Sequence, residues 1–248
     1  MRIAIFVTCL VDTLRPQVGF AAVKLLQQTG CSVEVPATQT CCGQPGYNNG
    51  DLESARVIAQ KTIEELSGYD HVVVLSGSCA GMIIHHYPRL FADDAVWLER
   101  AQALSARTHE LTVFLHDILK PDIQAQFQGS ITYHDSCSSL RELGIQSQPR
   151  ELLSSVHGLT LREMDETEIC CGFGGTFSVK YEEISSRMVA NKVACISASG
   201  ADAVVAADLG CLLNIAGRLR REGKTTRVFH IAEVLAGMTD APGLGEDG

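Results

Sequence analysis

The stretch Cys170-Cys171-Gly172-Phe173-Gly174-Gly175 repeats the pattern of an earlier stretch, Cys41-Cys42-Gly43-Gln44-Pro45-Gly46. Each cysteine pair is preceded by a single cysteine, with 31 or 32 residues between them, and is followed by another after 36 or 39 residues. Eight of the ten cysteines therefore fall into a first cysteine group, Cys9, Cys41, Cys42 and Cys79, and a second cysteine group, Cys137, Cys170, Cys171 and Cys211. Sets of four thiolates are typical of zinc and iron–sulfur sites. The sequence thus predicts two halves, each with a metal site.

The composition is that of a globular protein with an acidic balance. A chain of 248 residues with 46% hydrophobic content can build one large or two small cores, and the repeat favours two. The 20 Lys and Arg residues against 29 Asp and Glu residues leave a net charge of −9. This charge argues against binding to nucleic acid or to anionic lipid.

The compartment is inferred from what the apolar segments lack. The run Ile3–Val11 follows a single arginine, is soon interrupted by Asp12, and has no small-residue cleavage site, so it is interpreted as a strand and not as a signal peptide. No apolar run approaches the roughly 18–20 residues of a membrane span. We expect a cytoplasmic protein that is not integral to a membrane, in which cysteines are ligands or buried thiols more often than disulfides.

Short apolar runs alternate with helical patterns in both halves. The predicted strands are Arg2–Val7, Ser32–Pro36, Val72–Leu75, Ile131–His134, Leu159–Met164 and Ala203–Ala206. The predicted helices are 18–28, 51–66, 150–156 and 181–198. The closing segments Val113–Leu119 and Val228–Leu235 also resemble each other, and Tyr87–Thr108 is interpreted as an insertion in the first half.

This order predicts an α/β fold with two pseudo-symmetric Rossmann-like lobes and mainly parallel sheets. Residues 1–122 would form the first lobe, 123–237 the second, and 238–248 a flexible tail. Every cysteine of the two groups follows a predicted strand, and ligand sites in such sheets lie at the carboxyl ends of the strands. Each group is therefore expected to meet at one sheet edge.

Two other interpretations of the cysteine pairs remain open. Adjacent cysteines can be buried core thiols or a redox-active disulfide, although two pairs in register with flanking cysteines favour metal sites. Cys31 and Cys195 lie outside the pattern and are expected to be core residues.

The repeat resembles that of the CCG-domain, cysteine-rich iron–sulfur proteins, a family that includes the B subunit of heterodisulfide reductase. The stretches 77–82, 170–177 and 207–214 are similar in detail to the members that act in lactate utilization, and the resemblance covers nearly the whole chain. It implies an iron–sulfur subunit, with one cluster per lobe, that works with other subunits, including a ferredoxin-like iron–sulfur protein, to oxidise L-lactate to pyruvate.

The chain departs from the fuller family pattern, in which each half ends in Cys-x-x-Cys. Met82 stands three residues after Cys79, and Asn214 stands three residues after Cys211. Only four cysteines per half are available, which suits an ordinary four-thiolate cluster better than a five-thiolate one. Zinc fits the same count, so iron rests on the resemblance, and zinc is kept as the alternative occupant.

Three residues near the second group are candidates for a further role. His134 and Asp135 precede Cys137 and could assist a redox centre as hydrogen-bonding partners or proton carriers. The simpler interpretation, which we favour, is a capping aspartate and a half-buried histidine. Arg141 could bind a substrate carboxylate, but an exposed surface arginine is the simpler interpretation, and the catalytic residues stay unassigned.

Three functions follow as hypotheses. The first is an electron-transfer subunit of a lactate-oxidising complex, an oxidoreductase subunit that is not active alone. The second is a zinc-binding scaffold that assembles partner proteins, and the third is a thiol–disulfide redox protein that uses the adjacent cysteine pairs. The glycines after Cys171 lack both the Walker lysine and the strand–GxGxxG–helix context, so we expect no flavin or nicotinamide site.

Overall fold

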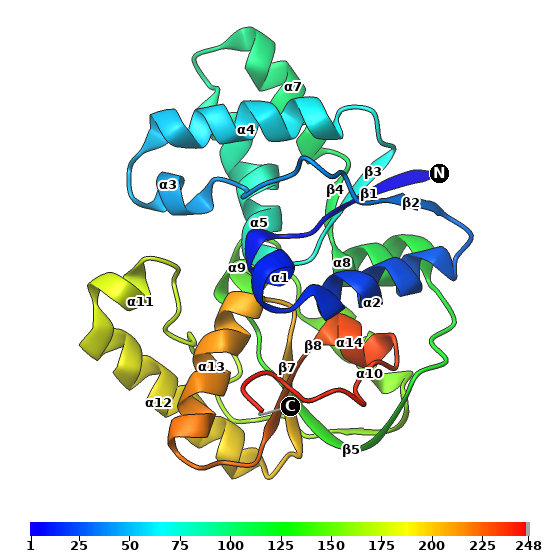
Figure 1. Ribbon diagram of the computed structural model, residues 1–248, viewed down its shortest axis with the longest axis vertical. Coiled ribbons are helices and arrows are strands. Elements are labelled where there is room, and N and C mark those ends of the chain that lie inside the picture. Colours follow the sequence, from blue (N-terminus) through cyan, green and yellow to red (C-terminus); the bar gives the residue numbers. More distant parts are fainter. Residues whose placement is uncertain (247–248) are drawn as a thin grey trace. The chain divides into compact units, whose positions relative to one another are not determined.

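The computed structural model describes residues 1–246, which form two compact units. The first unit is Met1–Leu119 and the second begins at Lys120. In Figure 1 the first unit runs from blue to green and the second from green to red. Each unit contains one four-stranded parallel sheet. The predicted α/β fold with parallel sheets is confirmed.

In the first unit two helices connect the first two strands. Its elements are β1 (Arg2–Phe6), α1 (Cys9–Leu14), α2 (Pro16–Gln27), β2 (Ser32–Glu34), α3 (Gln44–Asn48), α4 (Leu52–Leu66), β3 (His71–Val74), α5 (Gly77–Gly81), η1 (Met82–His86), α6 (Tyr87–Leu90), α7 (Ala95–Ser105), β4 (Thr108–Glu110), α8 (Leu111–Val113) and η2 (Phe114–Leu119). The segments η1 and η2 have π-helical hydrogen bonding.

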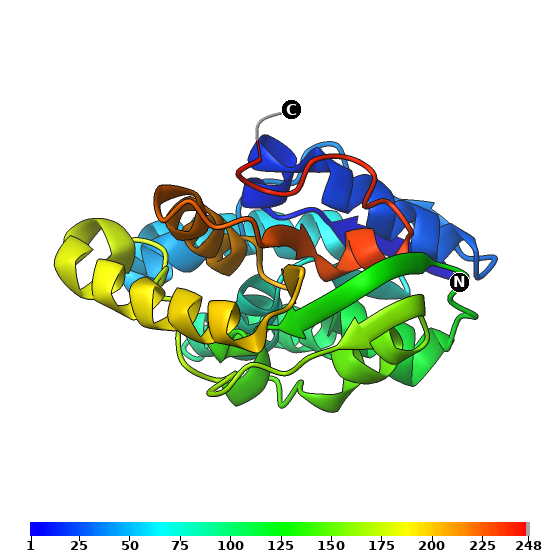
Figure 2. The same cartoon turned by 90° about the horizontal axis from the view of Figure 1, so that it is seen from below.

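The second unit repeats the alternation with fewer helices between its third and fourth strands. Its elements are β5 (Gln126–Tyr133), α9 (Cys137–Arg141), α10 (Ser147–Ser154), β6 (His157–Leu161), α11 (Phe177–Lys180), α12 (Glu182–Ser199), β7 (Ala203–Ala206), α13 (Leu209–Arg221), β8 (Arg227–His230) and α14 (Ile231–Leu235). Figure 2 shows the long strand β5 in green and the helix α12 in yellow.

The two sheets have the same strand order. It is β2-β1-β3-β4 in the first unit and β6-β5-β7-β8 in the second. The central strands are buried, as continuous apolar runs require in a parallel sheet that is covered on both faces: every residue of β7 and the last three of β3 have no more than traces of exposure. The matched order means that the same loops meet at the same sheet edge in both units.

Helices pack against one another on the sheets. In the second unit α12 contacts α13 and α10 contacts α14, as Figure 1 shows. The helices α4 and α12 occupy corresponding places and bury residues at the same spacing. The buried positions of α4 are Ala55, Ala59, Thr62, Ile63 and Leu66, and those of α12 are Ser185, Val189, Lys192, Val193 and Ile196. Lys192 therefore stands where the first unit has a threonine.

The expected alignment of the closing segments Val113–Leu119 and Val228–Leu235 is wrong. Val113–Leu119 is helical, and the fourth strand of the first unit is β4, which lies earlier at Thr108–Glu110. In the second unit the strand β8 includes Val228 itself. The corresponding residues are Glu110 and His230, which each end the strand and cap the helix that follows. The extra element of the first unit is the helix α7.

The segment after α14 returns along β8. The Leu244 N–H donates to the Val228 carbonyl at 2.9 Å, and the Arg227 side chain donates to the carbonyls of Thr239 and Ala241 at 3.1 and 3.2 Å. Residues 247 and 248, the end of the tail expected to be flexible, lie outside the described residues. Within residues 1–246, no helix combines the length and apolar character that crossing a membrane requires.

Candidate metal sites at the two cysteine groups

The parallel sheets place the cysteines of each group at one edge. Cys9 begins α1 just after β1, the Cys41-Cys42 pair lies in the loop after β2, and Cys79 lies in α5 after β3. Because β1 is hydrogen-bonded to both β2 and β3, the three segments that bear the cysteines leave neighbouring strands. The second group is built in the same way, from α9 after β5, the loop after β6, and α13 after β7.

The thiols of the first group are in direct contact. The Cys42 thiol donates to the Cys79 sulfur across 3.2 Å. The Cys41 sulfur accepts a hydrogen bond from the Gly43 N–H at 3.4 Å, and the Cys41 side chain is hydrogen-bonded to those of Cys42 and Cys9. The four side chains thus form one chain of contacts.

The second group repeats this chain of contacts. Cys170 is hydrogen-bonded to the thiols of Cys137 and Cys171, and Cys171 is in turn hydrogen-bonded to Cys211. The Gly172 N–H donates to the Cys170 sulfur at 3.4 Å. The structure therefore brings together both predicted sets of four, and their role as ligands stays a prediction.

Crowding sets the protonation of these thiols. Hydrogen bonds with Cys42 and Cys9 lower the pKa of Cys41 to about 2, whereas the hydrogen bond with Cys41, together with burial, raises the pKa of Cys9 far above its usual value. The pKa of Cys42 is raised for the same reasons, with Cys79 adding to the effect. One thiolate per group is stable alone, and ionising all four requires a compensating cation. A metal centre bound by the four sulfurs would supply that positive charge.

A glycine shapes each cysteine loop. Gly43 and Gly172 have φ angles of +83° and +80°, in the left-handed region that residues with a Cβ adopt at a cost. Gly172 also lies so close to α12 that a Cβ would stand 2.7 Å from the Ser185 carbonyl oxygen, whereas at Gly43 the nearest atom would be 3.4 Å away. These conformations turn the glycine N–H groups toward the sulfurs of Cys41 and Cys170.

A buried imidazole adjoins the second group. His134 has no exposed surface, so the expectation of a half-buried residue is wrong. One of its ring nitrogens and the sulfurs of Cys171 and Cys211 all lie within 4.8 Å of one another. Burial lowers the pKa of His134 to about 4, and the charge of Lys192 adds to this effect, so the ring is neutral at pH 7. An imidazole beside two thiols is a donor set that fits zinc or iron.

Asp135 does not cap a helix as predicted, because it is held by an arginine. The cap of α9 is Ser136. The Asp135 carboxylate, 1% exposed, accepts two hydrogen bonds from Arg150 at 2.9 and 2.8 Å. Arg150 also bonds Glu163 at 2.6 Å and lies over the Tyr133 ring. This bidentate ion pair fixes the segment that leads into Cys137.

Lys192 fixes the other cysteine-bearing segment of the second unit. Its side chain is fully buried, and its ammonium group donates to the carbonyls of Glu166 and Thr167 at 2.8 and 3.0 Å. These residues lie in the loop that leads to Cys170. Burial lowers the pKa of Lys192, and nearby cysteines, Cys171 among them, act in the opposite direction.

In the first unit a neutral side chain holds the loop before the cysteine pair. The Gln39 amide accepts from the Val7 N–H at 2.7 Å and donates to the carbonyls of Ile5 and Pro36 at 3.3 and 3.1 Å. It therefore joins the loop before Cys41 to the end of β1. Sequence reasoning missed Gln39, Arg150 and Lys192. The one available signal was Lys192, a basic residue at an apolar position of a helical pattern.

The remaining candidates lie outside the groups. Arg141 is exposed on α9. The hydrogen bond with Cys170 and burial raise the pKa of Cys137, and the charge of Arg141 acts in the opposite direction, so Arg141 adjoins the second group without being part of it. Cys31 and Cys195 belong to neither group, but both are partly exposed, so the expectation that they are core residues is wrong.

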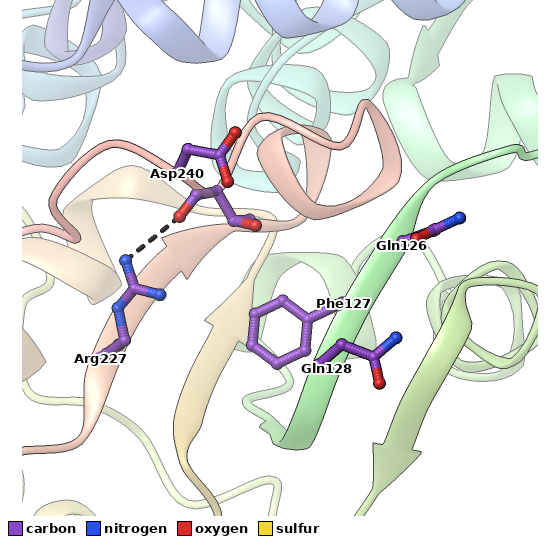
Figure 3. Close-up of a pocket in the computed structure, with 6 residues that line it drawn as sticks. Gln126, Phe127, Gln128, Arg227 and Asp240 are labelled. Carbon is purple, nitrogen blue, oxygen red and sulfur yellow. Dashed lines mark hydrogen bonds between the residues drawn. The ribbon is translucent and has the colours of Figure 1, made fainter.

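A surface hollow in the second unit lies away from the cysteines. It is lined by Gln126, Phe127, Gln128, Arg227, Thr239 and Asp240. Gln126 and Arg227 are the first residues of β5 and β8, so the hollow is at the amino ends of the strands, opposite to the cysteine group. Figure 3 shows Arg227 turned toward the chain segment of Asp240, and its guanidinium is occupied by backbone carbonyls. No donor of the cysteine groups contributes to this hollow.

Two α/β units, each with a parallel sheet and a matching cysteine group, define a cysteine-rich protein with a repeated domain. The family of the cysteine-rich (CCG) domain matches residues 3–84 and 131–216, one copy in each unit. Both copies include all four cysteines of their group.

Individual relatives resemble the chain over nearly its whole length. The lactate utilization protein A of Bacillus cytotoxicus is 49% identical over 236 residues, which cover 95% of this chain and 98% of the relative. The protein of the same name from Bacillus cereus (strain G9842) is 48% identical with the same coverage. The chain therefore belongs to the cysteine-rich domain family, and within it to the lactate utilization protein A family.

We predict that the two loop glycines differ in their tolerance of a methyl group. Gly172→Ala places a Cβ against backbone and in a strained conformation, so we expect a loss of about 3 kcal/mol in the free energy of unfolding. Gly43→Ala has only the conformational penalty, about 1 kcal/mol. Urea denaturation of the two variants checks this difference. Equal losses would mean that the close approach to α12 is not a constraint.

We also predict that Arg150 stabilises the second unit through its ion pair with Asp135. Arg150→Ala leaves a buried carboxylate without a partner, which costs about 3 kcal/mol. Arg218→Ala is the matched control, because its pair with Glu222 lies on the surface of α13 and contributes under about 1 kcal/mol. Urea denaturation at pH 7 compares the two. A loss for Arg150→Ala no larger than for the control would contradict the buried-pair assignment.

Proposed function

We propose that this chain is an iron–sulfur electron-transfer subunit of a multi-protein system that oxidises L-lactate to pyruvate. In this proposal each cysteine group holds one cluster through its four sulfurs. The observation that carries it is the gathering of four thiols at the same sheet edge of both units, with contacts as short as 3.2 Å. The relatives named lactate utilization protein A supply the metabolic setting.

Several features of the chain suit an anionic sulfur-bound centre. Cys9 and Cys137 begin helices, and Cys211 is in the first turn of α13, so helix amino ends favour the ionised sulfurs. The Gly43 and Gly172 N–H groups already donate to sulfur. Hydrogen bonds of this kind tune the potential at which such centres exchange electrons.

The two alternatives account for less of the structure. A disulfide within a group would use two sulfurs and leave two close thiols without a role. Zinc suits four cysteines, and a zinc-binding scaffold remains the second candidate because the donor set fits both metals. Chemical composition separates iron from zinc directly.

The first test is therefore the metal and sulfide content of anaerobically purified protein. We expect iron with acid-labile sulfide and visible absorption from sulfur-to-iron charge transfer. Stoichiometric zinc without sulfide, in protein never exposed to air, would contradict the iron–sulfur assignment and favour the scaffold.

The control for the metal content compares a group cysteine with an outside one. Cys171→Ser should remove about half of the bound metal, because one of two sites loses a ligand. Cys195→Ser should retain the metal, since Cys195 belongs to neither group. Equal metal content in the two variants would count against the division into ligands and other thiols.

The proposal requires other proteins for the chemistry on lactate. Oxidising a 2-hydroxy acid removes two electrons and needs a base, whereas iron–sulfur clusters commonly pass single electrons. We infer that a ferredoxin-like iron–sulfur partner exchanges electrons with this chain. We place its docking near the second cysteine loop, where Val179, Tyr181 and Ile184 are 82%, 56% and 55% exposed. An apolar contact avoids the repulsion that a net charge of −9 would impose on an acidic partner.

We predict that the purified, cluster-loaded chain does not oxidise lactate on its own. The assay measures pyruvate formation with an artificial electron acceptor, first with this chain and then with the remaining subunits of the system added. We expect turnover only in the second case. A rate for the isolated chain equal to that of the whole system would make this chain the catalytic subunit and overturn the electron-transfer assignment.

A further inference from the structure

The two cysteine groups differ by one buried ring. Counting back three residues from the first cysteine of each group gives Phe6 in the first unit and His134 in the second. Both side chains are buried, at 1% and 0% exposure, and both stand where the central strand leads toward its cysteine. An apolar ring at one place and an imidazole at the matching place make the two groups chemically different.

The imidazole of His134 has no hydrogen bond of normal geometry within the part of the chain that the structure describes. Both of its ring nitrogens are buried and without a hydrogen-bond partner. Buried polar groups in folded proteins are nearly always paired, because burial removes their bonds to water. At least one nitrogen of the ring therefore calls for a partner that the protein chain itself does not supply.

The polar neighbours of His134 are already occupied. The two carboxylate oxygens of Asp135 accept hydrogen bonds from Arg150. The ammonium group of Lys192 donates to two backbone carbonyls. One of these, the Thr167 carbonyl, approaches the ring closely enough to raise its pKa, but it can meet only one of the two ring nitrogens. The other nitrogen is left for a further partner.

The sulfurs of the second group lie within reach of such a nitrogen. A His134 nitrogen lies within 4.8 Å of both the Cys171 and the Cys211 sulfurs, and these two are themselves within that distance. Three donor atoms so close together can share one metal ion, since metal–sulfur and metal–nitrogen bonds are about 2.3 and 2.0 Å long.

We propose that His134 is an additional ligand of the metal centre in the second unit, which it binds through a ring nitrogen. The second site then has one nitrogen and four sulfur donors, and the first site has four sulfur donors alone. This inference rests on the proposed function for the identity of the metal and extends it by making the two centres unequal.

The test detects nitrogen at the metal. Protein labelled with ¹⁵N-histidine is purified anaerobically, reduced to a paramagnetic state, and measured by pulsed electron paramagnetic resonance. We expect a coupling to one histidine nitrogen of the strength found for a directly bound ligand. No coupling, or only the weak coupling transmitted through a hydrogen bond to sulfur, would overturn the proposal without any variant being needed.

Variants assign the signal to one residue. His134→Phe should abolish the nitrogen coupling, and it copies the side chain that the first unit accepts at the matching position. His109→Phe is the control, because His109 is a partly buried histidine on β4 of the first unit and lies outside both cysteine groups. A coupling that persists in His134→Phe, or that disappears in His109→Phe, would contradict the assignment.

Failure of the proposed function gives a different result. If anaerobic protein contains no iron, the iron–sulfur assignment fails, and the same measurement is made on protein loaded with cobalt(II), a paramagnetic substitute for zinc. A directly bound nitrogen that is lost in His134→Phe would then support the His134 ligand at a thiol-held metal. Absence of this nitrogen from the cobalt spectrum would overturn it.

Discussion

The mutual repulsion of thiolates is the constraint on which the rest of this structure depends. Two full negative charges 3.2 Å apart, the separation of the Cys42 and Cys79 sulfurs, would repel each other by about 5 kcal/mol at an effective dielectric constant near 20. A domain is stable by only about 5–15 kcal/mol in total. Four ionised sulfurs in such contact would unfold the scaffold unless a cation joins them. In the absence of such a cation, most of these sulfurs therefore stay protonated.

Both units meet this constraint with the same backbone arrangement. The strand order is the same in both sheets, and the buried positions of α4 and α12 have the same spacing. Each cysteine loop turns at a glycine whose N–H reaches a sulfur. These shared features are the strand order, the helix spacing and the loop glycines, and they explain why two units that differ at other side chains gather their cysteines in the same way.

Much of this arrangement could be predicted from the sequence. Strands such as Ala203–Ala206 are continuous apolar runs, and cysteines that follow such runs must meet when the strands are parallel and adjacent. The alignment of Val113–Leu119 with Val228–Leu235 failed because a short apolar run has the same composition in a helix and in a strand. The packing of single side chains could not be predicted either. The full burial of His134 beside Lys192 depends on α12, which is distant in sequence. The pairing of Asp135 with Arg150, 15 residues later, depends on how α10 packs.

The charges that hold the loops distinguish the two units. The residues described for the first unit include no buried lysine, arginine or histidine, and its loop before Cys41 is held by the neutral Gln39. In the second unit the fully buried Lys192 holds the loop before Cys170. A fixed positive charge in a region of low dielectric stabilises added negative charge more than a neutral amide does. Under the proposed function, an electron that enters the pair of centres is therefore more stable on the second one. The substitution of lysine for threonine at one helix position, Lys192 for Thr62, thus adds to the difference that His134 in place of Phe6 makes between the two units.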